Sequence, residues 1–182
     1  MATFNQRNIT EFRSRLSGGG ARANLFEVEI AFPEGLGINE SDTSDKIPFL
    51  VKAAEIPASN LGNIPVPYRG RVLPVAGDRT FDPWTVTIIN DTDFLIRNAI
   101  ERWSNGINNH SDNEGLVNPV DYQVDAFVDH LDRNGNTIKS YTFRGMFPTI
   151  IGQVDLSYEQ ATTLETFECT WRYQYWESNT TT

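Results

Sequence analysis

The chain has 182 residues, of which 39% are hydrophobic and 12% aromatic, enough for one domain with a substantial core and too many for wholesale disorder. Its formal charge of −9 argues against a conventional nucleic-acid binder, because such proteins hold phosphates with clustered Lys and Arg. One cysteine, Cys169, excludes an internal disulfide and a multi-cysteine metal site. No secretory signal or membrane-length apolar stretch is visible, so we expect a protein assembled in a cytoplasm, without a membrane anchor.

Residues 1–22 form a basic N-terminal arm. Residues 8–16 have helical spacing, with Thr10 as the candidate cap, and a glycine run follows them as a hinge. The arm has four basic side chains and one acidic side chain, a net charge of +3, which leaves −12 for the remainder of a chain of −9. This contrast favours docking of Arg13 and Arg15 on an acidic neighbouring copy, although a frayed, solvated terminus fits the charge equally well.

The first predicted strand spans residues 24–32, where apolar side chains alternate with Glu27 and Glu29. Residues 33–45 are polar and contain glycine, which predicts an exposed loop. A second strand is predicted at residues 47–54. The alternation in the first strand places its two glutamates on the face opposite the core.

Residues 56–74 carry four prolines, which cannot donate hydrogen bonds to a sheet ladder. We therefore predict an extended loop or an edge hairpin that reaches out from the body. The only charged side chains of this segment after Glu55 are basic, Arg69 and Arg71.

Residues 84–89 alternate strongly and predict a strand. A helix is predicted to begin at a cap among residues 90–92 and to run to about residue 105, because it has one apolar stripe. The stripe consists of Leu95, Ile96, Ala99, Ile100 and Trp103. A polar, glycine-containing loop is predicted at residues 110–118.

The last third of the chain is predicted to be continuous β-structure. Residues 122–131 and 137–147 flank an Asn-Gly pair, a strong hairpin signal. Residues 154–158 and 166–176 are predicted to pair across a turn near residues 161–163.

These elements predict one mainly β domain, a β-sandwich or barrel of antiparallel strands with one flanking α-helix and a short N-terminal helix or arm. The predicted organisation is the arm at residues 1–22, the β domain at residues 23–177, and a disordered polar tail at residues 178–182.

The reactive residue types do not gather into a recognisable catalytic or metal-binding motif. His110 and His130 are far apart in the chain, and Cys169 alternates with apolar residues as a small buried side chain would. Residues 132–136 resemble the front of a calcium loop but lack its downstream glutamate, which favours a turn. We predict no enzyme, cofactor or metal, although two carboxylates that meet in the fold as a glycosidase pair stay open.

The segment Ala-Gly-Asp-Arg-Thr-Phe at residues 76–81, followed by Asp-Pro-Trp-Thr-Val-Thr at residues 82–87, resembles the signature of tail tube proteins of T4-like contractile phages. Other pieces of the chain resemble that family in the same order. They are residues 23–30, 51–58, 64–66, 145–149 and 174–177. The resemblance covers roughly residues 20–177, while the loop at residues 33–45 is longer than the family pattern, which leaves contacts there open.

The resemblance implies a protomer of hexameric rings that stack into the inner tube of a contractile tail. Its implied partners are further copies of itself, the tail sheath protein, and the baseplate and tail terminator proteins. Phage DNA would pass through the lumen without specific binding, and the implied location is the virion. Ring closure would join sheets of neighbouring subunits, and head-to-tail stacking would use different surfaces at the two ends.

Several residues fit roles in such a tube. Candidate inter-ring or inter-subunit contacts are Arg13, Arg15, Arg69, Arg71, Asp78 and Arg79. Asp78 and Arg79, in the signature turn, would form a structural or interfacial ion pair, or only a local turn contact. Candidate lumen-lining acids, which would repel phosphates, are Glu27, Glu29, Asp125 and Asp129; an ordinary outer surface is the alternative for them.

Other functions remain open at this point. A bacterial contractile injection system or a baseplate–tube junction would use the same fold. A β-sandwich carbohydrate-binding module would instead be a monomer with Trp171, Tyr173 and Tyr175 in solvent. A glycosidase ranks last.

Overall fold

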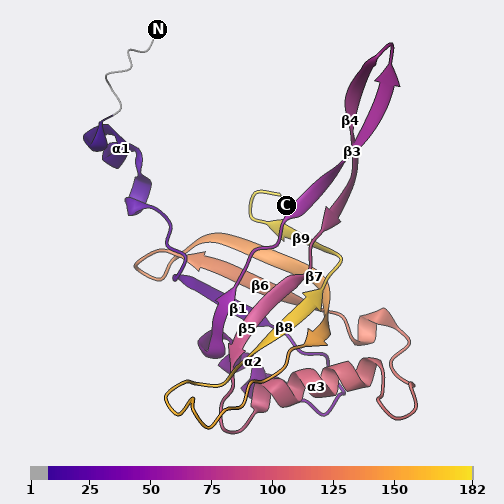
Figure 1. Ribbon diagram of the computed structural model, residues 1–182. Coiled ribbons are helices and arrows are strands. Elements are labelled where there is room, and N and C mark those ends of the chain that lie inside the picture. Colours follow the sequence, from indigo (N-terminus) through magenta and orange to yellow (C-terminus); the bar gives the residue numbers. More distant parts are fainter. Residues whose placement is uncertain (1–7, 182) are drawn as a thin grey trace.

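Seven antiparallel strands form one folded sheet in the order β1-β6-β7-β8-β5-β2, with β9 paired to β7 (Figure 1). The computed structural model describes residues 8–181. The strands of this sheet are β1 (Phe26–Ile30), β2 (Val51–Ala54), β5 (Trp84–Ile89), β6 (Val124–Leu131), β7 (Thr137–Ile151), β8 (Thr166–Arg172) and β9 (Tyr175–Ser178). The predicted mainly β class is confirmed.

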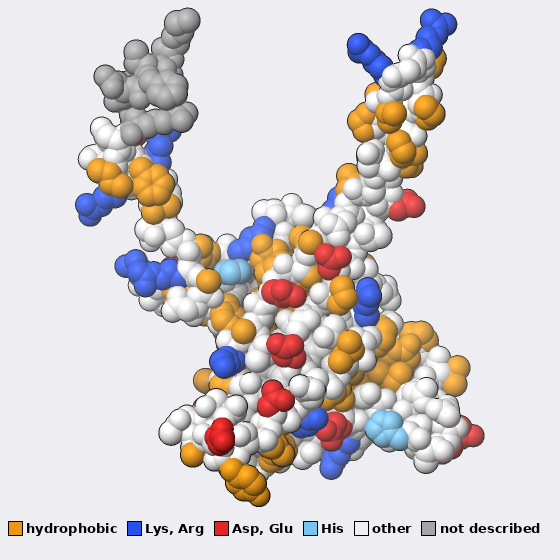
Figure 2. Space-filling view, viewed as in Figure 1, with side chains coloured by type: hydrophobic (Ala, Val, Ile, Leu, Met, Phe, Trp, Pro, Cys, Tyr) orange, Lys and Arg blue, Asp and Glu red, His pale blue; other side chains and the backbone are white. Residues whose placement is uncertain are grey.

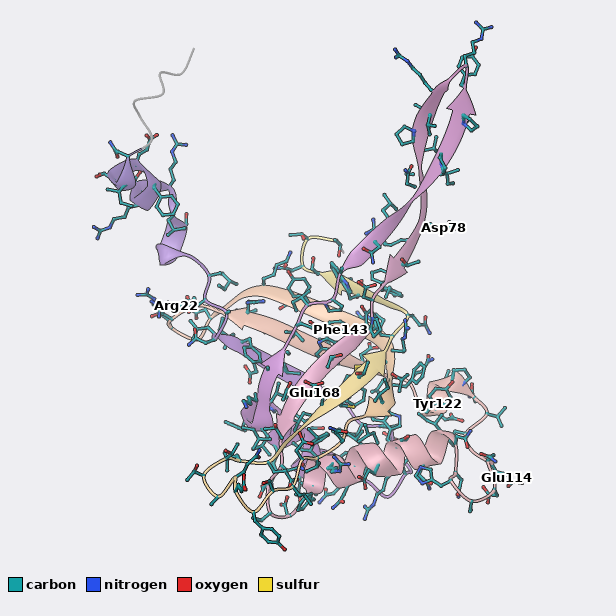
Figure 3. The ribbon with its side chains drawn as sticks, in the orientation of Figure 1. Arg22, Asp78, Glu114, Tyr122, Phe143 and Glu168 are labelled. Atoms are coloured by element: carbon teal, nitrogen blue, oxygen red, sulfur yellow. The ribbon has the colours of Figure 1, made fainter. Side chains whose placement is uncertain are left out.

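Strand β7 takes part in both layers of the sandwich. Its first part pairs with β6 and β9, and residues 147–151 pair with β8. The two parts meet near Gly145, whose φ of +63° favours glycine. Across the layers, Phe143 of β7 stacks on Trp84 of β5 with ring centroids 4.4 Å apart, and Phe143 lies at the centre of the body (Figure 3).

The core lies between the two layers and continues to the helix α3 (Leu95–Ile107). The alternating strands supply buried side chains from one face each, as their sequences predict. These are Val28, Ile30, Trp84, Val86, Ile88, Ala126, Val128, Phe143, Phe167, Cys169 and Trp171. Burial raises the pKa of the Cys169 thiol, which confirms its interpretation as a small buried side chain.

Helix α3 packs the predicted apolar stripe against the core. Ile96, Ala99, Ile100 and Trp103 are all buried. Trp103 Nε1 also donates a hydrogen bond to the backbone oxygen of Tyr122, at 2.8 Å. The stripe is therefore confirmed, with Leu95 partly exposed at its start.

The cap predicted among residues 90–92 is wrong. The helix begins later, after Phe94, which has a left-handed backbone with φ of +53°. Asp93 Oδ1 accepts a hydrogen bond from the backbone nitrogen of Leu95, at 3.0 Å. An acceptor on Asp93 thus satisfies a backbone donor that the first turn leaves unpaired.

Helix α2 (Glu40–Leu50) corrects two predictions. It occupies the second part of the loop predicted at residues 33–45, and it leaves only β2 of the strand predicted at residues 47–54. Thr43 and Ile47, one turn apart, are fully buried against the body. Its helical pattern is weak because only this pair is buried, so tertiary packing decided the conformation.

Lys46 links α2 to the start of α3. Its Nζ lies 2.7 Å from Asp91 Oδ2 and 2.5 Å from Asp93 Oδ2. The hydrogen bonds from Lys46 lower the pKa of both carboxyl groups, and the same bonds raise the pKa of Lys46.

We expect Lys46→Met to lower the thermal unfolding midpoint at neutral pH. The difference from wild type should shrink as the pH falls below about 4, near the unfolded carboxyl pKa. The sign follows because a carboxyl pKa lowered by folding stabilises the folded state above the unfolded pKa, and this contribution is lost as pH falls through the folded pKa. Unfolding midpoints measured against pH test this, with Lys52→Met as the exposed control. A difference that stays constant down to pH 2 would contradict the role of the carboxylates.

The C-terminal third follows the prediction in its first half. The β6–β7 hairpin turns at Asn134-Gly135, and Asp132 Oδ1 accepts hydrogen bonds from the backbone nitrogens of Asn134 at 2.7 Å and Asn136 at 2.9 Å. These bonds lower the pKa of Asp132. The turn interpretation of residues 132–136 is confirmed.

The strand predicted at residues 154–158 is wrong. Leu156 and Tyr158 are exposed, Leu156 by 82%, and residues 152–165 form a loop. The strand predicted at residues 166–176 is divided into β8 and β9, and β8 pairs with β5 and β7. In the segment predicted as a disordered tail, β9 ends at Ser178 and residues 179–181 form a turn, and residue 182 lies outside the described residues.

The remaining helical elements are short. They are α1 (Ile9–Arg15) and the 3-10 helices η2 (Ser17–Gly19) and η3 (Pro119–Asp121). Within residues 8–181, no helix has both the length and the apolar character that a bilayer crossing requires.

Candidate assembly surfaces

Strands β3 (Ser59–Tyr68) and β4 (Arg71–Phe81) form a separate hairpin that projects away from the sandwich (Figure 1). Its loop is Arg69-Gly70, and both residues are left-handed, with φ of 45° and 83°. Two left-handed residues close tight hairpins whose twist matches that of the strands. The projection predicted at residues 56–74 is confirmed as a hairpin that continues to residue 81.

The hairpin exposes an unusual number of large apolar side chains. They are Leu61, Ile64, Val66, Tyr68, Val72, Leu73 and Val75, each at least 42% exposed. Arg69 and Arg71 lie at its tip, where Figure 2 shows two blue side chains. A contiguous apolar surface on a projecting element indicates a partner surface.

Aromatic residues hold the root of the hairpin on the sandwich. Phe81 contacts Tyr173 and Trp176 edge-on, with ring centroids 6.1 Å apart in each pair. Trp176 Nε1 donates to the backbone oxygen of Pro57 at 3.1 Å, and the Tyr173 hydroxyl donates to that of Asp82 at 2.6 Å. Burial raises the pKa of Tyr173 to about 12, so its hydroxyl remains a donor. These contacts fix both entry points of the hairpin.

Helix α1 stands apart from the sandwich as a second projection (Figure 1). Its cap is Asn8, whose Oδ1 accepts from the backbone nitrogen of Glu11 at 2.8 Å, so the cap predicted at Thr10 is wrong. Arg15 pairs with Glu11 at 3.0 Å, whereas Arg13 has no ion pair within residues 8–181. One side of the helix exposes apolar side chains. They are Ile9, Phe12 and Leu16, exposed by 78%, 62% and 42%.

The four predicted lumen acids lie on one face of the β1–β6 pair, opposite the core. Glu27 is directly across from Asp129, and the neighbouring Glu29 and Asp125 share their face by alternation. Glu177 of β9 lies on the same face, across from Thr142 of β7. The structure thus brings the four predicted acids together on one face and adds Glu177 to them.

One cation is built into this acidic face. Arg144 lies 2.5 Å from Asp125 and 2.7 Å from Glu177, and its hydrogen bonds with them raise its pKa. Asp129 instead accepts from the Ser140 hydroxyl at 2.5 Å. Among the described residues this face therefore carries five carboxylates and one guanidinium, which leaves it acidic.

A comparison with protein families identifies the family of this chain. The family described as "Phage tail tube protein" matches residues 21–179. The chain belongs to the phage tail tube protein family. It is a structural subunit of a tail tube, and the family is not an enzyme family.

Two tail tube proteins illustrate the relationship. The chain is 35% identical over 162 residues to the tail tube protein gp19 of Enterobacteria phage T4, which covers 88% of this chain and 93% of that protein. It is 34% identical over 167 residues to a tail tube protein of Serratia phage KSP90. This match covers 91% of this chain and 93% of that protein. The predicted resemblance is confirmed.

Solved structures share the fold. The cap of the anti-feeding prophage has a TM-score of 0.64 at 14% identity and covers 87% of this chain and 90% of its own. The sheath/tube terminator of the extracellular contractile injection system PVC has a TM-score of 0.62 at 11% identity. This match covers 87% of this chain and 95% of the terminator chain. At these identities the likeness concerns the fold alone.

Asp78 and Arg79 do not lie in a turn, which corrects the position predicted from the signature. They are successive residues of β4, so their side chains point to opposite faces, and Figure 3 labels Asp78 on the hairpin. Arg79 Nη1 donates to the Ser59 hydroxyl at 2.7 Å. Within residues 8–181 neither side chain forms an ion pair.

The sugar-binding alternative required the side chain of Trp171 to face solvent. Trp171 is fully buried, whereas Tyr175 is 45% exposed. Among residues 8–181, no three His, Cys, Asp or Glu side chains gather as metal ligands would. His110 and His130 lie in different parts of the body, on the loop after α3 and on β6.

The aromatic root of the hairpin was not predicted from the sequence. Tyr173 and Phe81 are 92 positions apart in the chain, and no local pattern joins them. The signal within the sequence is the dense aromatic run that ends the chain, Trp171, Tyr173, Tyr175 and Trp176, whose members face different surroundings.

Proposed function

We propose that six copies of this tail tube subunit form a ring, that rings stack into the inner tube of a contractile tail, and that the genome leaves through the lumen into the host. The observation that carries this proposal is the β3–β4 hairpin, which projects with exposed apolar side chains and is held rigidly at its root. An apolar projection on one end of a subunit suits head-to-tail stacking, which produces a linear polymer.

Free strand edges support closure of the ring. Strands β1 and β2 are the two ends of the sheet path, and each pairs with a single strand among the described residues. An exposed edge offers unpaired backbone groups to another chain. Pairing between the edges of neighbouring subunits would satisfy these groups around the ring.

The two projections serve as connectors between subunits in this proposal. Arg69 and Arg71 at the hairpin tip, and Arg13 and Arg15 on α1, would contact the acidic body of neighbouring copies. Figure 2 shows Lys and Arg on both projections and acidic side chains along the visible face of the body. Asp78 and Arg79 would pair across an interface.

The sheath would surround the tube, and the baseplate and terminator proteins would close its ends. One chain of a sheath-tube complex of the PVC injection system has the same fold, with a TM-score of 0.59 at 10% identity. The subunit would be assembled in the host cytoplasm, remain in the virion, and have no enzymatic activity.

The acidic face of β1, β6 and β9 would line the lumen. Its carboxylates would repel DNA phosphates and keep the genome from adhering during ejection. Glu27, Glu29, Asp125 and Asp129 carry this role, and Arg144 holds Asp125 in place.

We expect tubes of the double variant Glu27→Lys/Glu29→Lys to retain short DNA in a nuclease-protected form, because cationic walls bind phosphates. Wild-type tubes should retain none, and added salt should release the DNA from the variant. Protected DNA in purified tubes is the measurement. Glu34→Lys/Glu114→Lys, at two exposed sites off this face, makes the same charge change as a control. Equal retention by both variants would contradict the lumen assignment.

Electron microscopy of the purified chain, beside its mass in solution, tests the function. Rings or hollow tubes are the expected result, either spontaneously or after nucleation on isolated baseplates. A chain that stays monomeric even on baseplates would overturn the proposal.

A further inference from the structure

Arg144 is an unexpected residue for the wall of the proposed conduit. It alternates with the buried Phe143, which places it on the acidic face of β1, β6 and β9, and among residues 8–181 it is the one cation of that face. A guanidinium is planar and always charged, and its parallel N–H groups fit a phosphate well. A free arginine on this face would therefore hold passing DNA.

Two carboxylates occupy this guanidinium. Nη1 lies 2.5 Å from Asp125 Oδ2, and Nε and Nη2 lie 2.8 Å and 2.7 Å from Glu177 Oε1. All three nitrogens thus have a carboxylate partner, and the group carries one positive and two negative charges. The Arg144 side chain is 41% exposed, so burial does not keep a phosphate away from it. A phosphate can bind only by displacing a carboxylate.

The fold holds both carboxylates in place. Asp125 lies where the pairing of β6 with β7 is irregular, and its Oδ1 also accepts a hydrogen bond from the backbone nitrogen of Gly145, at 3.1 Å. Glu177 lies on β9 across from Thr142 of β7. The three charged side chains come from three strands, so strand register brings them together.

Other arginines of the chain have different surroundings. Within residues 8–181, Arg144 is the arginine with two carboxylate partners, whereas Arg15 and Arg97 have one each, from their own helices. Arg69 and Arg71, at the tip of the hairpin, have none among the same residues. The chain thus leaves arginines unpaired on the projection and neutralises the arginine on its acidic face.

We infer that Asp125 and Glu177 mask Arg144, so that its N–H groups are not available to the phosphates of nucleic acid. The other acids of the face have no ion pair within residues 8–181 and repel phosphates at longer range. The inference rests on the proposed position of this face in the lumen. It goes beyond that position by dividing the acids of the face into two kinds, those that repel DNA and those that occupy a cation.

Two double variants with the same charge change test the masking. Asp125→Asn/Glu177→Gln removes the masking carboxylates, and Glu27→Gln/Glu29→Gln removes two others and keeps the masked group. Sheath-free tubes of each are incubated with short double-stranded DNA at low ionic strength and treated with nuclease. The first variant should protect at least about tenfold more DNA than the second, because arginine–phosphate contacts repeated around the lumen act together. Added salt should release that DNA.

A triple variant identifies the group that binds. Adding Arg144→Gln to Asp125→Asn/Glu177→Gln should return DNA protection to the wild-type level. An ion pair that only stabilises the fold would make these variants easier to unfold and would not make their tubes bind DNA. The readout therefore separates masking from a purely structural role.

A further measurement does not require tubes. The NMR signal of the Arg144 Nε–H group is followed in the purified chain while inorganic phosphate is added to wild type and to Glu177→Gln. The signal should move in the variant and stay in place in wild type, because only the variant leaves Nε without its carboxylate. Equal shifts in both proteins would show that Glu177 does not mask the guanidinium.

The outcomes in tubes separate the inference from the function on which it rests. Equal DNA protection by the two double variants, or protection that survives Arg144→Gln, would overturn the masking and leave the tube function standing. Glu27→Lys/Glu29→Lys tubes that retain no DNA would show that this face lies outside the lumen, which would overturn the inference together with that assignment. A wild-type chain that forms no tubes on baseplates would overturn the proposed function itself.

Discussion

Replacing residues 63–76 by Asn-Gly should abolish tube formation while leaving the sandwich folded. The replaced segment consists of exposed side chains, and Gly62 and Gly77 already lie close together, so a tight turn can connect them. We expect the free energy of unfolding to change by no more than about 0.5 to 1 kcal/mol, as for surface changes without core contacts. The loss of assembly would be complete, because the apolar surface proposed to join rings is removed.

Electron microscopy and thermal unfolding of the same preparations measure the two effects separately. The matched control replaces only the tip, Arg69-Gly70 to Asn-Gly, which removes one charge and keeps both apolar faces. This control should still form tubes. Normal tubes from the shortened chain would show that the hairpin does not join rings.

Trp84→Ala should have the largest effect on stability. Trp84 is fully buried, stacks on Phe143 across the two layers, and donates from Nε1 to the backbone oxygen of Glu55 at 2.8 Å. Removal of a buried tryptophan leaves a cavity and an unpaired carbonyl, at a cost of about 3 to 5 kcal/mol. Urea denaturation, with the midpoint and slope fitted together, measures this loss.

Two variants separate the causes of that loss. Trp84→Phe keeps a ring against Phe143 and removes the hydrogen bond, so it should lose less than half as much stability as the alanine variant. Tyr158→Ala removes a ring that is fully exposed and should leave stability unchanged. Equal losses in the Trp84→Phe and Trp84→Ala variants would show that the hydrogen bond, rather than the packing, matters at this position.

Local patterns predicted the elements whose periodicity coincides with burial. Strands β1, β5 and β6 alternate and bury one face each, and α3 buries the stripe that its spacing indicates. The Asn-Gly turn and the proline-rich hairpin were predicted because these residues restrict the backbone independently of tertiary contacts. The family signature at residues 76–87 could likewise be recognised without a structure.

Patterns failed where burial and periodicity diverge. Helix α2 buries chiefly Thr43 and Ile47, too few residues to produce an amphipathic signal. Residues 154–158 alternate like a strand but pair with no strand among residues 8–181, and Leu156 remains exposed. In both cases the surrounding structure, rather than local preference, decided the conformation.

Residue patterns alone were enough to predict the mainly β class, the projecting hairpin, the acidic body with a basic arm, and the family. Which distant residues meet became visible only in the folded chain. The register of β1 against β6 places Glu27 across from Asp129, and the folded sheet brings Tyr173 and Trp176 beneath Phe81. Such contacts depend on strand register and chain topology, which no local pattern encodes, because a shift of one residue would turn every side chain of a strand to its other face.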